Sequence, residues 1–176
     1  MSDSPYARVR RKIWHTRQFR ALSREARELF LYIITCPHSN ILGMFVLRPG
    51  YVIDDMQLAS QPFGKPLQER FHKPLQELLS EGLVKWDPDT EIMLDVEHLD
   101  KNPLDNPNQV KAAIRKLDEL PNTVLFRDLK PLVERLGKPF TKPLLERLEE
   151  RLGEPFGKPV TVTVTVTEEP PNPPLK

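Results

Sequence analysis

Cys36 and His38 are the two neighbouring side chains best suited to hold a metal ion. A structural zinc site takes four protein ligands, however, and the other histidines, His15, His72 and His98, lie far apart at no metal-ligand spacing. A buried free thiol at the end of a helix, beside a surface histidine, explains the pair better. The sequence therefore predicts no metal ion and no other cofactor.

The sequence also contains no recognisable catalytic motif. The Gly-Lys-Pro segments at 64–66 and 157–159 lack the first glycine and the Ser or Thr of a phosphate-binding loop, and there is no Gly-x-Ser-x-Gly motif. Asp54 and Asp55 are adjacent carboxylates, but the first turn or the surface of a helix accounts for them. We therefore expect a binding protein rather than an enzyme.

Basic residues are concentrated near the N-terminus. The first 27 residues carry eight of them against Asp3 and Glu25, a local charge of +6, whereas the whole chain of 176 residues has a formal charge of +1. A basic arm before a folded domain can follow a groove or the backbone of DNA. Alternatively, Ile13 and Trp14 pack on the domain and leave the arginines in solvent. The eight residues are Arg8, Arg10, Arg11, Lys12, Arg17, Arg20, Arg24 and Arg27.

The elements that must position these residues begin with a helix after Ser23, which is a natural N-cap. Positions 26, 29, 30, 33 and 34 are apolar at helical spacing, and Pro37 ends the pattern. Residues 43–47 (GMFVL) are typical of a short buried strand. Residues 51–60 predict a second helix from a weaker pattern.

A third helix and a hairpin follow. Positions 67, 71, 75, 78 and 79 are apolar at helical spacing, and Gly82 suits the left-handed residue that closes a helix. Two apolar stretches then flank Asp-Pro-Asp-Thr at 87–90, a type I turn with Pro88 at its second position. Pro74 removes one backbone donor, so either the helix is kinked there or a new helix begins near Lys73.

The order helix, strand, helix, helix and two-stranded hairpin is that of a winged helix-turn-helix domain, predicted here for residues 21–97 behind a basic arm at 1–20. The fold class is thus α+β, mainly helical with a small β-hairpin. Residues 98–136 predict a helical extension with Asn106 or Asn108 as its cap. Residues 137–176, with a repeated Pro-Phe-x-Lys-Pro unit and a Val-Thr run, predict a low-complexity, disordered tail.

In a winged helix, the helix before the hairpin normally enters the major groove of duplex DNA. Placing its leucines inward turns Arg70, Lys73 and Gln76 outward, where the cations could bond guanine or phosphate and the amide could pair with adenine. Glu69 and Glu77 share this predicted face, so an ordinary solvated surface is the alternative.

The hairpin is less suited to DNA than the helix. Asp87, Asp89 and Glu91 around its tip would repel phosphates, and Lys85 is the one cation nearby that could contact them. We therefore expect the helix, rather than the hairpin tip, to make the main contact.

Composition restricts the setting of the protein. A single cysteine excludes an internal disulfide and is typical of a reducing, cytoplasmic environment. No segment approaches ~20 apolar residues, and the N-terminus lacks the apolar stretch of a signal peptide, so we expect no membrane association. With 26 Lys and Arg against 25 Asp and Glu, any attraction to nucleic acid must be local.

Three segments resemble phage and prophage replication proteins. They are KIWHTRQFRALSREARELFLYIITCPHSNILGMFVL at 12–47, LLSEGLVKWD at 78–87 and NPNQVKAAI at 106–114. Together they are similar to the N-terminal winged-helix region of replisome organisers, DnaD-like in the broad sense, over about residues 10–120. The resemblance implies binding at a phage or mobile-element origin through Arg70, Lys73 and Gln76. It also implies recruitment of a replicative helicase or helicase loader, for which the tail is a plausible handle.

The sequence thus predicts a double-stranded DNA-binding protein of replication initiation, with two alternatives. A transcriptional regulator of this size would usually dimerise on two half-sites, so a homo-oligomer stays open. A winged-helix module that binds proteins and no DNA is favoured by the near-zero net charge and opposed by the arginine-rich arm. Salt dependence separates these readings, because phosphate contacts weaken steeply as salt is added.

Overall fold

The computed structural model describes residues 9–58 and 67–153. The chain is mainly helical with one small three-stranded antiparallel sheet, in which the strand order is β1-β3-β2. The elements up to the sheet are η1 (Arg11–His15), α1 (Arg17–Ala21), α2 (Arg24–Thr35), β1 (Met44–Val46), α3 (Pro49–Asp55), α4 (Leu67–Ser80), β2 (Val84–Asp87) and β3 (Ile92–Asp95). The later elements are α5 (His98–Lys101), α6 (Pro107–Glu119), α7 (Phe126–Glu134), η3 (Pro139–Thr141) and α8 (Lys142–Gly153).

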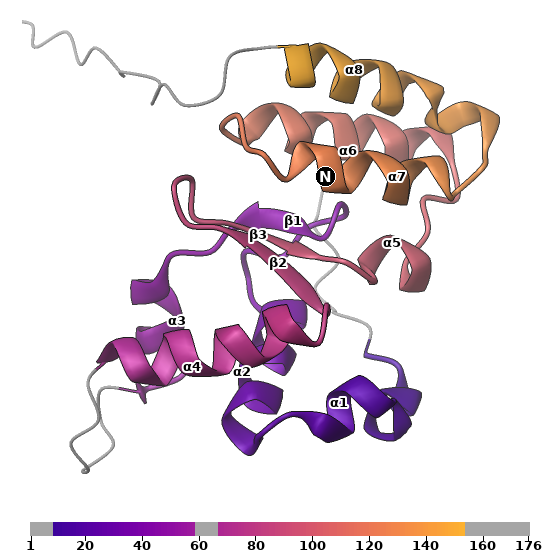
Figure 1. Ribbon diagram of the computed structural model, residues 1–176. Helices are drawn as coiled ribbons and strands as arrows, with labels where there is room; N and C mark the ends of the chain where they lie inside the picture. Colours follow the sequence, from indigo (N-terminus) through magenta and orange to yellow (C-terminus); the bar gives the residue numbers. More distant parts are fainter. Residues whose placement is uncertain (1–8, 59–66, 154–176) are drawn as a thin grey trace, which may run out of the picture.

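The sheet lies between two layers of helices (Figure 1). On one side are α1 to α4, and on the other are α6, α7 and α8. Because side chains alternate between the faces of a strand, β1 and β3 supply both cores. Phe45 and Met93 pack with the first layer, whereas Met44 and Leu94 pack with the second. The predicted winged-helix segment and the helical extension therefore share one sheet.

Local signals in the first layer act as the sequence predicts. The Ser23 hydroxyl accepts a hydrogen bond from the backbone N–H of Ala26 and caps α2. Gly82 has a φ of 69° directly after α4, the left-handed conformation that glycine adopts without strain. Pro74 lies inside α4, which runs from Leu67 to Ser80 as one helix. No new helix begins near Lys73.

The described part of the basic arm predicted at 1–20 is folded onto the domain. Residues 11–15 form η1 and residues 17–21 form α1, and both pack on α2 through the buried side chains of Ile13 and Phe19. Thr16 caps α1 by accepting a hydrogen bond from the backbone N–H of Phe19. The apolar positions thus hold this segment on the domain, as the packing alternative predicted for Ile13. Arg8 lies outside the described residues.

The tail predicted to start at residue 137 is wrong up to residue 153. Leu144 and Leu148 of α8 are fully buried in the second core. Pro139 and Pro143 lie in the first turns of η3 and α8, where a helix has no use for the missing N–H. The proline-rich composition therefore concealed two helix starts. The Val-Thr run at 160–167 lies outside the described residues.

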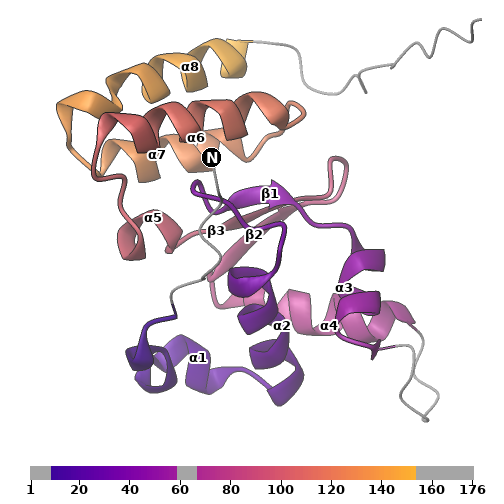
Figure 2. The ribbon, with the colours of Figure 1, turned by 180° about the vertical axis from the view of Figure 1, so that it is seen from behind.

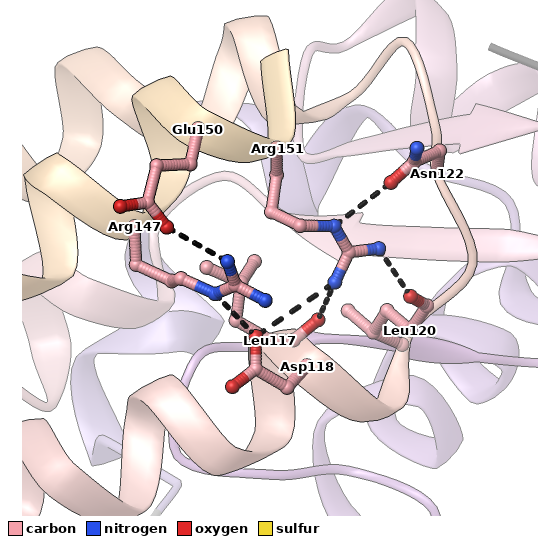
Figure 3. Close-up of polar contacts among 7 residues, drawn as sticks. All are labelled: Leu117, Asp118, Leu120, Asn122, Arg147, Glu150 and Arg151. Carbon is pink, nitrogen blue, oxygen red and sulfur yellow. Dashed lines mark hydrogen bonds and ion pairs between the residues drawn. The ribbon is translucent and has the colours of Figure 1, made fainter. Parts of the chain in front are cut away.

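Arg151 fastens α8 to the end of α6 (Figure 3). The side chain is buried, and its guanidinium donates hydrogen bonds to the carbonyls of Leu117 at 3.0 Å and Leu120 at 2.6 Å, and to Oδ1 of Asn122 at 2.8 Å. The last carbonyls of a helix lack the usual helical donor, and Arg151 donates to two of them; that of Leu117 also accepts a hydrogen bond from the backbone N–H of Leu120. It also lies 5.1 Å from the ring centre of Phe126 in α7, so one side chain joins three helices.

The hairpin tip is fixed to the second layer rather than projecting freely. Asp87 is only 5% exposed, and its carboxylate accepts hydrogen bonds from the Thr90 hydroxyl at 2.7 Å and from the Thr123 hydroxyl in the α6–α7 connection. Burial raises the pKa of Asp87, but the hydrogen bonds from Thr123 and Thr90 outweigh it, so the pKa is lowered. Asp87, which the sequence placed near the hairpin tip, therefore connects the sheet to the second layer of helices.

Candidate nucleic-acid interface

The solvent-facing side of α4 carries Glu69, His72, Lys73, Gln76 and Ser80. Lys73 and Gln76 are exposed, as the sequence predicts. His72 and Ser80 were missed, although both lie four residues from Gln76 and therefore share its face. The face holds one lysine and one glutamate, so its charge is balanced when the histidine is neutral.

Arg70 and Glu77 lie on the flank of α4 that faces α2, contrary to the prediction that they point outward. The Arg70 guanidinium donates a hydrogen bond to the Leu58 carbonyl after α3. A Glu77 carboxylate oxygen accepts one from the backbone N–H of Ser23, at 2.8 Å. Helical spacing alone left both residues at the edge of the apolar stripe, and the position of α2 decided which way they turn. Arg70 therefore contributes to packing between elements.

A groove of about 310 Å³ runs between α2 and α4. Its floor is apolar, with Leu29 among the residues that line it, and its rim carries more carboxylates than cations. The carboxylates of this rim would attract a cationic partner, and Glu69 and Lys73 lie where the rim meets the exposed face of α4. The charged lining residues are Glu25, Glu28, Glu69, Arg70, Lys73 and Glu77.

Lys85 faces the second helical layer and has a partner there. It lies in β2 between Val84 and Trp86, which pack toward the first layer, and alternation turns Lys85 to the opposite face. There its ammonium group forms an ion pair with Asp128 of α7. Helices cover both faces of this sheet, which the hairpin pattern alone did not reveal, so Lys85 meets α7 on the second face.

The described basic residues of the N-terminal segment gather on η1, α1 and the start of α2. Arg11, Lys12, Arg17 and Arg20 are exposed, and the segment from residue 9 to residue 22 contains no Asp or Glu. The guanidinium of Arg10 donates to the Lys101 carbonyl at 2.9 Å, which fixes the start of η1 beside α5. We call these five cations the η1–α1 surface.

The next two arginines along the chain have internal partners. Arg24 pairs with Glu28 at 2.9 Å on the surface of α2. Arg27 donates to the carbonyls of Phe19 at 3.0 Å and Arg20 at 2.9 Å, and so closes the end of α1. Among the arginines and lysines of residues 9–27, this leaves Arg11, Lys12, Arg17 and Arg20 with neither an ion pair nor a side-chain hydrogen bond in the described part of the chain.

The η1–α1 surface and α4 both belong to the layer on the far side of the sheet from α6 to α8 (Figure 1). Seen from behind, α1 and α3 lie at opposite ends of this layer, with α2 between them (Figure 2). The exposed cations of α1 thus lie on the other flank of α2 from the acidic groove. The layer carries a basic side and an acidic side.

Cys36 and His38 do not converge on a common site. Cys36 is buried, and burial raises the pKa of its thiol. The His38 ring is exposed and stacks on Tyr51 with 5.0 Å between ring centres. Within residues 9–58 and 67–153, no three His, Cys, Asp or Glu side chains are grouped so that they could bind a metal ion. No helix in that part of the chain is both long and apolar enough to span a membrane.

Comparison of the chain with protein-family models, curated proteins and solved structures gave no match. The chemistry of its own surface therefore carries the functional argument.

Proposed function

We propose that this chain is a winged helix-turn-helix protein that binds double-stranded DNA in phage or mobile-element replication initiation. The order α2, β1, α3, α4, β2 and β3 and the strand order β1-β3-β2 support the winged-helix assignment. The observation that carries DNA binding is the η1–α1 surface, where Arg11, Lys12, Arg17 and Arg20 have no carboxylate nearby in sequence to neutralise them.

In this proposal the duplex is held mainly by charge. The cations of the η1–α1 surface contact phosphates, which position a protein on DNA without reading sequence. Lys73 and Gln76 on the exposed face of α4 reach base edges in the major groove. Arg70 and Lys85 have no part in the contact, because one bonds the Leu58 carbonyl and the other pairs with Asp128.

The place in replication rests on the resemblance of residues 12–47, 78–87 and 106–114 to replisome organisers. A protein that binds an origin must also bring in the unwinding machinery, so a replicative helicase or its loader is the proposed protein partner. Residues 154–176 are the proposed handle.

A protein-interaction module that does not bind DNA is the second candidate, and the acidic groove between α2 and α4 favours it. Glu25, Glu28, Glu69 and Glu77 around an apolar floor would accept a cationic helix or peptide. In this case the groove, rather than the η1–α1 surface, is the binding site.

The deciding experiment is fluorescence anisotropy of the protein on duplexes tiled across its own gene, from low to moderate salt. The test variant is R11Q/R17Q, and the matched control is K111Q/R115Q, which removes the same charge from exposed positions of α6. We expect salt-sensitive binding with one preferred tile. The test variant should weaken binding and reduce the slope of log K against log salt by about 0.9 for each phosphate that it no longer neutralises, and the control should change neither.

Each other outcome has a definite meaning. Equal binding to every tile would support DNA binding but contradict specific recognition of a replication origin. Equal weakening by both variants would remove the η1–α1 surface as the site. No binding at low salt would overturn the DNA proposal and leave the interaction module.

A further inference from the structure

Trp14 is the most exposed large apolar side chain in the described part of the chain. It is 56% exposed, although its neighbour Ile13 is buried. The other tryptophan, Trp86, is half-buried and packs on the first core. An indole on the surface contributes little to the core, so its position among cations calls for an explanation.

The local geometry places Arg11 on the same side of η1 as Trp14, and Arg17 follows at the start of α1. In a 3₁₀-helix, residues three apart lie one above the other, so η1 places Arg11 and Trp14 on one side while Ile13 points inward. Arg17 begins the next helix three residues later. The Trp14 ring packs perpendicular to Phe19 with 5.2 Å between ring centres. The buried Phe19 therefore orients the indole without covering it.

We propose that Trp14 stacks on an unpaired base while Arg11 and Arg17 hold the adjoining phosphates, so that the η1–α1 surface binds single-stranded DNA. The inference rests on the proposed function only in taking DNA as the ligand. An aromatic ring flanked by cations is the arrangement that holds single strands, because the ring stacks on a base of any sequence and the cations follow the backbone. Base pairing and stacking in a duplex hide the faces that an indole would use.

A membrane surface is the less suitable ligand. Interfacial helices insert a broad apolar face into lipid, but Ile13 and Phe19 of this segment are buried in the core, and only Trp14 and Val9 are exposed large apolar side chains there. Trp14 stands nearly alone among cations. A single indole with flanking arginines matches a nucleotide better than a lipid bilayer.

The first measurement uses Trp14 as its own reporter, since the chain has two tryptophans. Addition of an oligonucleotide of about 20 thymidines should quench the wild-type fluorescence by stacking. In W14L the remaining emission comes from Trp86 and should not respond.

The second measurement compares affinities for the same oligonucleotide and for a duplex of equal length. W14L should bind the single strand about 5- to 100-fold more weakly and the duplex within about 2-fold of wild type. W14F, which keeps a smaller ring, should fall between them. Y51L removes another exposed aromatic ring, on α3, and should change neither affinity. Thermal unfolding of each variant by circular dichroism checks that the fold is kept.

The remaining outcomes separate this inference from the proposed function. Duplex binding without single-strand binding by the wild type would overturn the role of Trp14 alone, whereas binding to neither would overturn both proposals. Equal loss on single strand and duplex in a folded W14L would make Trp14 a support of the surface and overturn stacking. Binding to vesicles of anionic lipid, lost in W14L, without single-strand binding would assign the surface to a membrane instead.

Discussion

Basic side chains have internal partners in the C-terminal helices but extend into solvent in the N-terminal segment. In α7 and α8, Lys130 pairs with Glu149 and Arg147 pairs with Asp118 and Glu150, while Arg151 is buried against backbone carbonyls. In η1 and α1, by contrast, Arg11 and Arg17 extend into solvent without an ion pair in the described part of the chain. The cations of α7 and α8 stabilise the fold through ion pairs and hydrogen bonds, whereas Arg11 and Arg17 are left to contact solvent or a ligand. The net charge of +1 conceals this division.

The contrast predicts that the largest loss of stability comes from the buried arginine. R151M should lower the free energy of unfolding by about 3 kcal/mol, because it removes three charge-assisted hydrogen bonds, among them the one from Arg151 to the carbonyl of the buried Leu120. Chemical denaturation with urea measures it. R147Q, which breaks two surface ion pairs, is the control and should have a smaller effect. An R151M protein as stable as wild type would contradict the structural role assigned to Arg151.

The next largest loss of stability is expected at Gly43, where the two layers of helices meet. Gly43 has a φ of 66°, and a Cβ there would lie 2.3 Å from the Cβ of His98 in α5. G43A should therefore cost about 2–4 kcal/mol, from strain and from the displacement of α5. Gly82 has a similar φ of 69° with open space around it, so G82A should cost only about 1 kcal/mol. Thermal unfolding measures the loss of stability in both variants, and the difference between them is the cost of the contact with His98. Equal losses would show that α5 moves aside without a measurable loss of stability.

The same junction holds two groups with opposite pH dependence. Burial raises the pKa of Asp95 to about 6 and lowers that of His98 to about 4. Asp95 therefore adds stability at low pH that is lost as the pH rises from about 4 to 6. His98 adds stability above about 6.5 that is lost as the pH falls to about 4. In the wild type these effects largely oppose each other.

Single substitutions should separate the pH dependence of stability that Asp95 causes from that of His98. Relative to wild type, D95N should gain stability at pH 7 by about 1–3 kcal/mol and lose that advantage toward pH 4. H98Q should gain relative to wild type as the pH falls from 6.5 to 4. Urea denaturation at several pH values measures both, and parallel profiles for all three proteins would remove the buried pair as the cause.

The smallest effect on stability is expected at the η1–α1 surface, the proposed DNA-binding site. R11Q/R17Q should unfold at the same temperature as wild type, because neither side chain has an internal ion pair in the described structure. A large drop in the unfolding temperature would mean that these arginines hold η1 and α1 in place. It would also remove the contrast between the two regions.

Signals read over a few residues predicted the structure best. The caps Ser23 and Asn106, the left-handed Gly82 and the strands of the hairpin are all confirmed, because each depends on neighbouring residues alone. The outward direction predicted for Arg70 was wrong because its partner, the Leu58 carbonyl, lies after α3, and the local pattern could not show that Lys85 pairs with Asp128 of α7. The proline-rich composition hid α8, although Leu144 and Leu148 repeat at helical spacing. The winged-helix assignment and DNA binding stay predictions.

The two-sided sheet has a further consequence for how the chain folds. Met44, Ile92 and Leu94 are fully buried by the C-terminal helices, so a fragment ending at residue 97 would expose one whole face of its sheet to water. β3 is the central strand and belongs to both cores. We expect the two helical layers to unfold together in one cooperative transition, with the amide hydrogens of β3 among the last to exchange with solvent. The chain from η1 to α8 is then one folding unit, and the first layer of helices needs the second layer in order to fold stably.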